Sequence, residues 1–279
     1  MSVLELTVWV SGGAFAAGFL GSLTGLGGGV VIVPLLTLVF GVNIRYAVGA
    51  SLVSVIATSS GAAAAYVKEG FSNIRIGMFL EIATSAGALF GAWLAGVVST
   101  GAIGITFGVV LLYSAWQSLR QPRDVPCGEQ ERDRWATRLK MHGSYPSREG
   151  PRRYSVRHVP EGFGLMLGAG TLSGLLGIGS GAVKVIAMDQ AMGIPFKVST
   201  TTSNFMIGVT AAASAGVYLS RGYVDPGLSM PVMLGVLAGS ILGTRVLVAA
   251  RTRSLRLVFA AVIGVLAVEM IYNSVTGKL

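Results

Sequence analysis

An apolar run from about Leu6 to Phe40 is interrupted in its middle by four glycines in five positions, Gly25-Leu26-Gly27-Gly28-Gly29. Glycine costs a helix interior roughly 1 kcal/mol relative to alanine, so this cluster predicts a break between two half-helices. At membrane depth, the main-chain groups that a break frees are tolerated only inside protein or along a cavity. The same pattern returns as Gly177-Ile178-Gly179-Ser180-Gly181. Paired breaks in two halves of one chain point to the binding site of a transporter.

Apolar runs fill most of the 279 residues, of which 52% are hydrophobic and 12% are charged, whereas soluble domains carry roughly 25% charged residues. The runs are continuous rather than alternating, which favours helices over a β-barrel. We therefore expect an all-α polytopic protein of the cell membrane, with the lipid bilayer as its main partner. The single cysteine, Cys127, excludes an intrachain disulfide and a cysteine-cluster metal site.

A polar, basic stretch divides the chain into a first transmembrane repeat (1–120), a loop (121–160) and a second transmembrane repeat (161–279). The expected helical segments are 6–24, 30–41, 46–66, 76–97 and 101–120, then 162–176, 182–192, 197–219, 228–250 and 255–275. Aromatic residues near the ends of these segments are expected to anchor at the membrane interface, namely Trp9, Trp93, Trp116, Tyr66 and Tyr218.

The two halves are repeats that superpose at a constant shift of 152 residues. Segments 30–41 and 182–192 are too short to cross a bilayer, since a crossing needs roughly 20 residues. If each broken pair is re-entrant, each half keeps three full crossings, and this odd number makes the halves inverted. The inverted arrangement, with the loop in the cytoplasm, also satisfies the positive-inside rule better than a parallel one. It places Arg45 and Arg221 together outside, whereas the parallel arrangement separates them.

Three segments resemble the sequence signatures of the TauE/SafE family of sulfite and organosulfonate exporters: Gly21–Pro34, Leu175–Val185 and Thr201–Thr210. The resemblance implies export of small sulfur-containing anions such as sulfite, sulfoacetate or related sulfonates. Two residues depart from the pattern, because Ser180 replaces a glycine common there and Ile186 stands where the first repeat has Pro34.

Each glycine break is followed by a helix start, whose free N–H groups and partial positive charge suit an anion. Glycine also lets the main chain approach a ligand closely. We therefore expect an anion cradle formed by Gly25, Gly27, Gly28 and Gly29 with Gly177, Gly179, Ser180 and Gly181. The alternative is that glycines only permit close helix packing, and this is the favoured interpretation for the pairs Gly87/Gly91 and Gly239/Gly243.

Lys184 lies in an otherwise apolar arm, and a lysine at membrane centre costs roughly 2.5–3.5 kcal/mol on insertion scales. It is therefore a candidate ligand for the anion; the alternative is a structural pair with Asp189 or Glu81. Its repeat counterpart is Ile32, so the site is expected to be asymmetric. Further candidates are polar donors on the helices that follow the breaks, Ser51, Ser203 and Asn204, although such groups also join membrane helices to one another. Glu81 and Asp189 are candidates for a coupling proton, although a structural ion pair is the favoured interpretation of both.

These residues predict a secondary transporter that works by alternating access, with no catalytic residue, cofactor or bound metal. No nucleotide-binding Gly-x-x-x-x-Gly-Lys-Ser/Thr motif is present in the sequence. Nucleic acid is not an expected partner, because the basic residues gather in a loop beside membrane spans. An anion channel that uses the same site is the main alternative, followed by a cation permease, an intramembrane enzyme and a scaffold. The sequence leaves the oligomeric state open, with a homodimer as one option.

Overall fold

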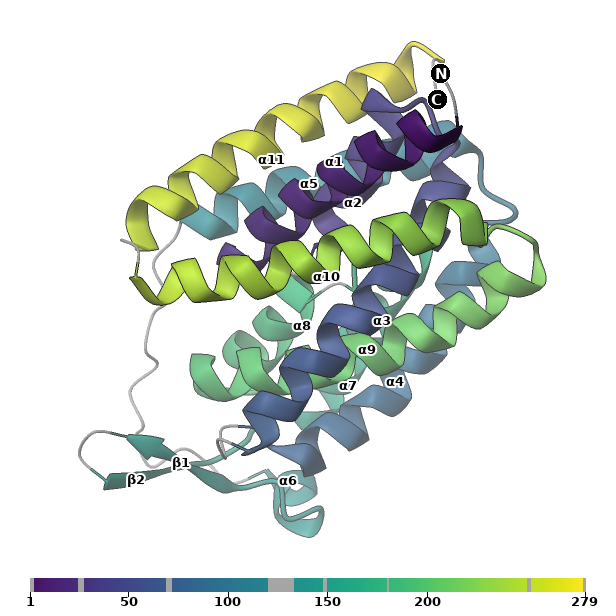
Figure 1. Cartoon of the computed structure of the whole chain (residues 1–279). Coiled ribbons are helices and arrows are strands. Elements are labelled where there is room, and N and C mark those ends of the chain that lie inside the picture. Colours follow the sequence, from purple (N-terminus) through teal and green to yellow (C-terminus); the bar gives the residue numbers. More distant parts are fainter. Residues whose placement is uncertain are drawn as a thin grey trace.

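The computed structural model describes residues 3–24, 28–68, 72–119, 133–147, 150–179, 181–249 and 252–277. Across these residues the chain is a bundle of helices with one small hairpin of strands (Figure 1). The expectation of a helical protein is confirmed, and every expected segment corresponds to a helix within a few residues. Gly25, Gly27 and Ser180 lie outside the described residues, so what was predicted of them stays a prediction.

The first half consists of one broken helix pair and three long helices. Helix α1 (Val3–Thr24) precedes the break, and α2 (Gly29–Pro34) continues directly into a π-helical turn, η1 (Leu35–Val39). Then follow α3 (Ile44–Lys68), α4 (Ile74–Leu94) and α5 (Thr100–Leu119).

The second half has the same elements in the same order: α7 (Val159–Leu176), α8 (Gly181–Ile186), η2 (Ala187–Ala191), α9 (Phe196–Ser220), α10 (Pro226–Ala249) and α11 (Thr252–Val275). From Gly29 and Gly181 onward, each element starts 152 residues after its counterpart. The π-helical turn also recurs, although only the first half has a proline before it. Pro34 is therefore not required for that turn.

Helices from opposite halves pack against each other in matching pairs. Helix α1 lies beside α10, α4 beside α7, α3 beside α9 and α5 beside α11 (Figure 1). Small residues allow the first two pairs to approach closely: a Cβ added at Gly87 or Gly91 would overlap the backbone of α7, and one at Gly239 would overlap the backbone of α1 at Phe15. The packing interpretation of these three glycines is confirmed.

Helices α4 and α9 keep one register along their whole length. The Asn73 N–H, just before α4, donates to Thr202 Oγ1 at 3.1 Å, and Thr210 Oγ1 donates to Glu81 Oε1 at 2.7 Å. At the far end, Arg221 donates to the Ala92 carbonyl at 3.0 Å. All three contacts join residues 129 positions apart, so the two helices run in the same direction.

The two ends of the bundle differ in what covers them. The chain ends marked N and C lie together at one end, and the polar segment with α6, β1 and β2 lies at the opposite end (Figure 1). Arg45 and Arg221 hold the same turn between α4 and α5: Arg45 donates to the Ala95 and Val98 carbonyls, and Arg221 donates to those of Ala92 and Trp93. Both arginines therefore lie at one end of α4.

The described helices offer a largely apolar surface. By length and composition, three helical stretches in the described residues are able to cross a membrane, 74–94, 100–117 and 226–243. Trp9, Trp93 and Trp116 are each at least half exposed, which agrees with a membrane-facing position. Tyr218 corrects the expectation of an interfacial anchor, because it is buried and donates its hydroxyl to the Leu175 carbonyl at 3.2 Å. The side chain of Tyr66 lies outside the described part.

The polar loop contains structure that the sequence did not predict. A short helix, α6 (Arg134–Arg138), is followed by a hairpin of β1 (Gly143–Ser147) and β2 (Gly150–Tyr154). Pro146 and Pro151 face each other in this hairpin. Proline has no N–H to donate. The two prolines can therefore face each other only as a non-hydrogen-bonded pair of the antiparallel hairpin.

Candidate functional site

The second glycine break is described apart from Ser180, and its main chain adopts a conformation that favours glycine. Gly177 and Gly179 both have φ of +68°, a region that residues with a Cβ rarely occupy. Gly177 ends α7, and Gly181 begins α8. At the first break, Gly28 precedes the first turn of α2 and its carbonyl accepts hydrogen bonds from Val31 and Ile32. Both halves therefore interrupt and restart their helices, as predicted.

The two breaks meet at α3. The Ser51 hydroxyl donates to the Gly177 carbonyl at 2.8 Å, so a first-half helix bonds to the second-half break. A Cβ placed on Gly29 would lie 2.8 Å from Ser51 Oγ and 3.1 Å from the Gly177 oxygen. The first distance is shorter than real Cβ atoms show and the second is tighter than most of their contacts, so a Cβ at position 29 would force its neighbours to shift.

The other half makes a related contact, although within the second half itself. Ser203, the counterpart of Ser51, donates to the Gly181 carbonyl at 3.3 Å. A Cβ on Gly181 would crowd Ile207, as one on Gly29 would crowd Val55. The structure thus brings Ser51 and Ser203, together with Gly29, Gly177, Gly179 and Gly181, into one region between α3 and α9.

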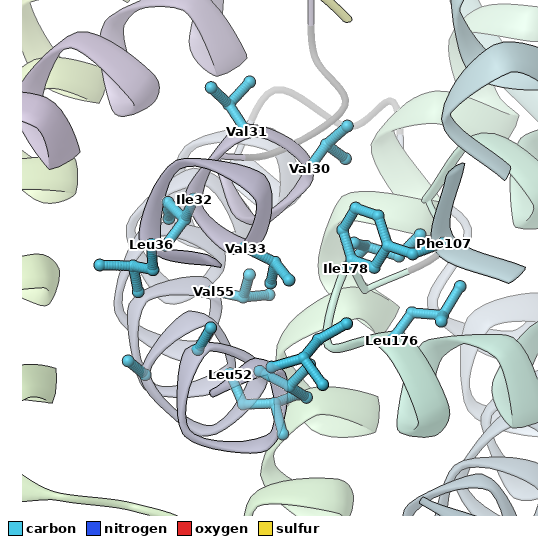
Figure 2. Packing of buried hydrophobic residues seen from close by; sticks show 14 of the residues in the cluster. Val30, Val31, Ile32, Val33, Leu36, Leu52, Val55, Phe107, Leu176 and Ile178 are labelled. Atoms are coloured by element: carbon cyan, nitrogen blue, oxygen red, sulfur yellow. The ribbon is translucent and has the colours of Figure 1, made fainter. Parts of the chain in front are cut away.

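The surroundings of the meeting point are apolar. Figure 2 shows Val30 and Val33 of α2 on the side that faces Ile178 and Phe107. All four side chains are buried. In such surroundings a bound anion would depend on main-chain N–H groups and on the few polar side chains that reach in, since an uncompensated buried charge is costly.

Lys184 is the charged group on α8, and it is completely buried. Its Nζ donates to Thr210 Oγ1 at 2.6 Å, and that hydroxyl donates to Glu81 Oε1 at 2.7 Å. A threonine of α9 thus bridges a cation of α8 and a carboxylate of α4. The alternative that paired Lys184 with Glu81 agrees with this geometry, and Asp189 in η2 is not part of this chain of hydrogen bonds.

Two more hydroxyls hold the carboxylate. Thr84 Oγ1 donates to Glu81 Oε2 at 3.0 Å, and Ser85 Oγ donates to Glu81 Oε1 at 2.9 Å. Glu81 is 8% exposed, so its charge is shielded by these donors and balanced by Lys184 rather than by water. A buried pair of this kind is stable as a pair, but removing one partner typically costs about 3–5 kcal/mol.

The hydrogen-bonded chain of Lys184, Thr210 and Glu81 does not recur at the positions that the repeat relates to these residues. The positions that correspond to Lys184, Thr210 and Glu81 are Ile32, Thr58 and Met233. Thr58 Oγ1 donates to the Ser54 carbonyl of its own helix at 3.0 Å and so joins no other element. The described side chains around Lys184 therefore differ from their repeat counterparts, while the asymmetry of a substrate site stays a prediction.

The remaining candidates occupy different places. Asn204 is half-buried on α9 and makes no hydrogen bond with the described residues. Its neighbour Ser203 bonds the second break, whereas Asp189 belongs to the π-helical turn η2. Sequence reasoning missed Thr210, Thr84 and Ser85 as parts of the site. For Thr210 a signal existed, since it closes the Thr201–Thr210 segment and matches Thr58 in the repeat.

Comparisons with known proteins agree on one class of protein. The model of the family described as "Sulfite exporter TauE/SafE" matches residues 10–270. The chain is similar to the probable membrane transporter protein YunE of Bacillus subtilis, with 26% identity over 93% of this chain and 95% of that protein. It is also similar to the probable membrane transporter protein YdhB of the same organism, with 25% identity over 83% and 86%.

A third relative is a probable membrane transporter protein of Xylella fastidiosa, with 24% identity over 98% of each chain. No solved structure matches the chain significantly. Together with the apolar helices, these relatives identify the chain as a membrane protein.

Proposed function

We propose a specific function for this chain, which belongs to the TauE/SafE family, whose model covers residues 10–270. The proposed function is export of small sulfur-containing anions, such as sulfite, sulfoacetate or related organosulfonates, by secondary transport. The observation that carries it is the meeting of the two glycine breaks at Ser51, because paired breaks of this kind form the substrate sites of transporters. No catalytic step is part of the proposal.

The halves are proposed to be inverted repeats that rock about this meeting point. Two observations support the inversion. Arg45 and Arg221 hold the same turn of α4 and α5, which agrees with the inverted arrangement and not with the parallel one. Helix α9 also runs in the direction of α4, while α10, the counterpart of α4, returns from α9 after only five residues (Figure 1).

The basic loop 121–160 is proposed to lie in the cytoplasm. It supplies Arg134, Arg138, Lys140, Arg152, Arg153 and Arg157 within its described part. Short loops rich in arginine and lysine stay on the cytoplasmic side of a membrane. Both chain ends lie at the opposite end of the bundle (Figure 1) and are therefore proposed to lie outside.

The anion is proposed to bind between the breaks, where glycine main chain, Ser51, Ser203 and Asn204 supply donors. Lys184 provides the charge when its hydrogen bond to Thr210 opens toward the anion. Because Glu81 balances Lys184 in the structure described here, an arriving anion would compete with that carboxylate. Protonation of Glu81 relieves the competition, which makes Glu81 the proposed site of a coupling proton.

The test is a thermal-shift screen of detergent-purified protein with sulfite, sulfate, taurine and sulfoacetate, since a ligand of the folded state raises the melting temperature. The informative variants are Lys184→Met and the double variant Lys184→Met/Glu81→Gln. The single variant leaves a buried carboxylate unpaired and should have a lower melting temperature than the wild type. The double variant removes both charges, so its melting temperature should return toward that of the wild type. If the double variant folds but still responds to the same anions as the wild type, Lys184 is not a ligand.

Flux in proteoliposomes separates a carrier from a channel. A carrier that holds one anion at a time exchanges labelled sulfonate inside for unlabelled sulfonate outside, and its rate saturates. An anion channel would instead give large single-channel currents and no counterflow. Absence of both flux and thermal response with every sulfur anion would contradict the proposed function.

A further inference from the structure

A basic pocket opens at the loop end of the bundle, away from the glycine breaks. It is a cavity of about 260 Å³ lined by residues 72–75, at the start of α4, by Lys140, by residues 142–144 and by Tyr154. The walls come from α4, from the segment after α6 and from both strands of the hairpin, at the bottom of Figure 1. This volume lies just below the ~300–1,000 Å³ of typical drug-sized ligand sites, which suits a small ion with a few waters.

Two cations line this pocket, and no carboxylate of the described residues pairs with them. Arg75 and Lys140 are both exposed, and a long hydrogen bond of 3.4 Å joins Arg75 Nη1 to the Lys140 carbonyl. Among the described residues, the single ion pair joins His158 and Glu161. The nearby carboxylate of Asp133 already accepts hydrogen bonds from the N–H groups of Trp135 and Val159, both at 2.9 Å.

Lys140 stands where a glycine would ordinarily be preferred. It follows the end of α6 with φ of +51°, and Met141 N–H donates to the Ala136 carbonyl at 2.9 Å. This pattern of a left-handed residue and a returning hydrogen bond is a Schellman motif, whose left-handed position usually holds glycine. In this conformation Lys140 lines the pocket together with the residues at the start of α4.

The rest of the wall supplies neutral donors. His142 Nδ1 accepts from the Val156 N–H at 3.3 Å, so the ring proton lies on Nε2, which faces Thr137 Oγ1 at 3.3 Å. The His142 ring therefore lines the pocket, and other groups would have to bind the ligand. Ser72 Oγ has no hydrogen-bond partner among the described residues. The Ile76 N–H is already capped by Asn73 Oδ1 at 3.2 Å, so the first turn of α4 adds the N–H groups of Ile74 and Arg75 and its partial positive charge.

We propose that this basic pocket is a second anion site, which binds one tetrahedral oxyanion group, phosphate, sulfate or sulfonate, between Arg75, Lys140 and the start of α4. Charge-assisted hydrogen bonds from a guanidinium and an ammonium suit such a group. The site goes beyond the proposed transport site, because it lies at the loop end of the bundle and shares no residue with the transport site. The oxyanion is either a free solute or the headgroup of an anionic lipid, and both have the same chemistry.

The test is isothermal titration of the full-length protein in uncharged detergent with inorganic sulfate and inorganic phosphate. Lys140→Gly suits the left-handed conformation and should keep or raise the melting temperature while affinity falls about tenfold, as loss of one charge-assisted contact predicts. Arg75→Gln should weaken binding similarly, and the two together should abolish it. The matched control is Arg138→Gln, which removes the same charge from an exposed residue of α6 that does not line the pocket.

The same titration in the Lys184→Met/Glu81→Gln background separates this site from the transport site. Sulfate and phosphate should still bind to this double variant if the basic pocket is the site, whether or not the variant transports anions. A second arm replaces detergent with nanodiscs of phosphatidylcholine, with and without phosphatidylglycerol. Binding of sulfate or phosphate that persists with phosphatidylglycerol assigns the site to a free solute, whereas binding that is present in pure phosphatidylcholine but lost with phosphatidylglycerol assigns it to the lipid headgroup. Binding that Arg138→Gln weakens as much as Lys140→Gly, or no binding in any arm, would overturn the proposal.

Discussion

The hydroxyl of Ser51 in the first half lies 2.8 Å from the carbonyl oxygen of Gly177 in the second half, and it is the donor of that hydrogen bond. Gly177 ends α7 in a left-handed conformation, so its carbonyl has no place in a regular helix ladder. The serine thus satisfies a buried acceptor that the break itself creates. This contact joins α3 directly to the second break.

Replacing this serine should destabilise the protein. We expect Ser51→Ala to lower the free energy of unfolding by about 1–3 kcal/mol, because it leaves a buried carbonyl without a partner. Ser54→Ala is the matched control, since Ser54 is equally buried but donates to the Ala50 carbonyl of its own helix. Equal melting temperatures for the two variants in detergent would contradict the role given to Ser51.

Two glycines of α7 should respond in opposite ways to alanine. A Cβ on Gly170 would overlap the backbone of α4 at Thr84, whereas a Cβ on Gly168 would meet nothing within 4 Å. Gly170→Ala should therefore push α4 and α7 apart and lower the melting temperature strongly, as overpacking typically costs about 1–3 kcal/mol. Gly168→Ala should be neutral or mildly stabilising, because alanine is the better helix former.

The hydroxyl between Lys184 and Glu81 should be essential for the stability of that pair. Thr210→Val keeps the shape of the side chain but removes the group that accepts from Lys184 and donates to Glu81. We expect a loss of about 2–4 kcal/mol, since two buried charges lose a shared partner. The repeat counterpart provides the control: Thr58→Val loses only a bond to its own helix. If both variants unfold at the same denaturant concentration, the bridge has no structural role.

The hairpin should be sensitive to strongly alkaline pH through Tyr154. Burial raises the pKa of the Tyr154 phenol, and the hydrogen bond from Asn73 acts in the opposite direction. Since the folded state favours the neutral phenol, its contribution to stability is complete below the ordinary tyrosine pKa of about 10 and is lost as pH rises through the raised value.

Hydrogen exchange of residues 143–154 across that range measures the effect. Tyr154→Phe should remove the pH dependence, and Tyr145→Phe, on the facing strand, should leave it unchanged. An unaltered profile in Tyr154→Phe would assign the alkaline opening to another group.

Much of the fold could be predicted from sequence because its causes are local. Apolar runs long enough to cross a bilayer set the helices, and clustered glycines set the breaks at Gly29 and Gly177–Gly181. The constant shift between repeats also predicted that Ile32 would make the site asymmetric. These features depend on neighbouring residues or on comparison of the chain with itself.

The contacts that complete the site could not be predicted in the same way. Glu81 and Thr210 are 129 residues apart, and no periodicity within either helix indicates that they meet. The hairpin was missed because Pro146 and Pro151 argue against strands when each is considered alone. Tyr218 was misjudged because a tyrosine near a helix end is typical of a lipid interface, while here Leu175 offers its hydroxyl a buried acceptor.

The common register of α4 and α9 limits how this protein can move. A sliding step of one helix along the other would have to break the bonds at Asn73, Glu81 and Ala92 together. The intermediate positions would leave a carboxylate and several carbonyls stranded in an apolar interior. These two helices should therefore move as one rigid unit. Any opening of the bundle should then occur at interfaces between other helices, which such a series of hydrogen bonds does not hold together.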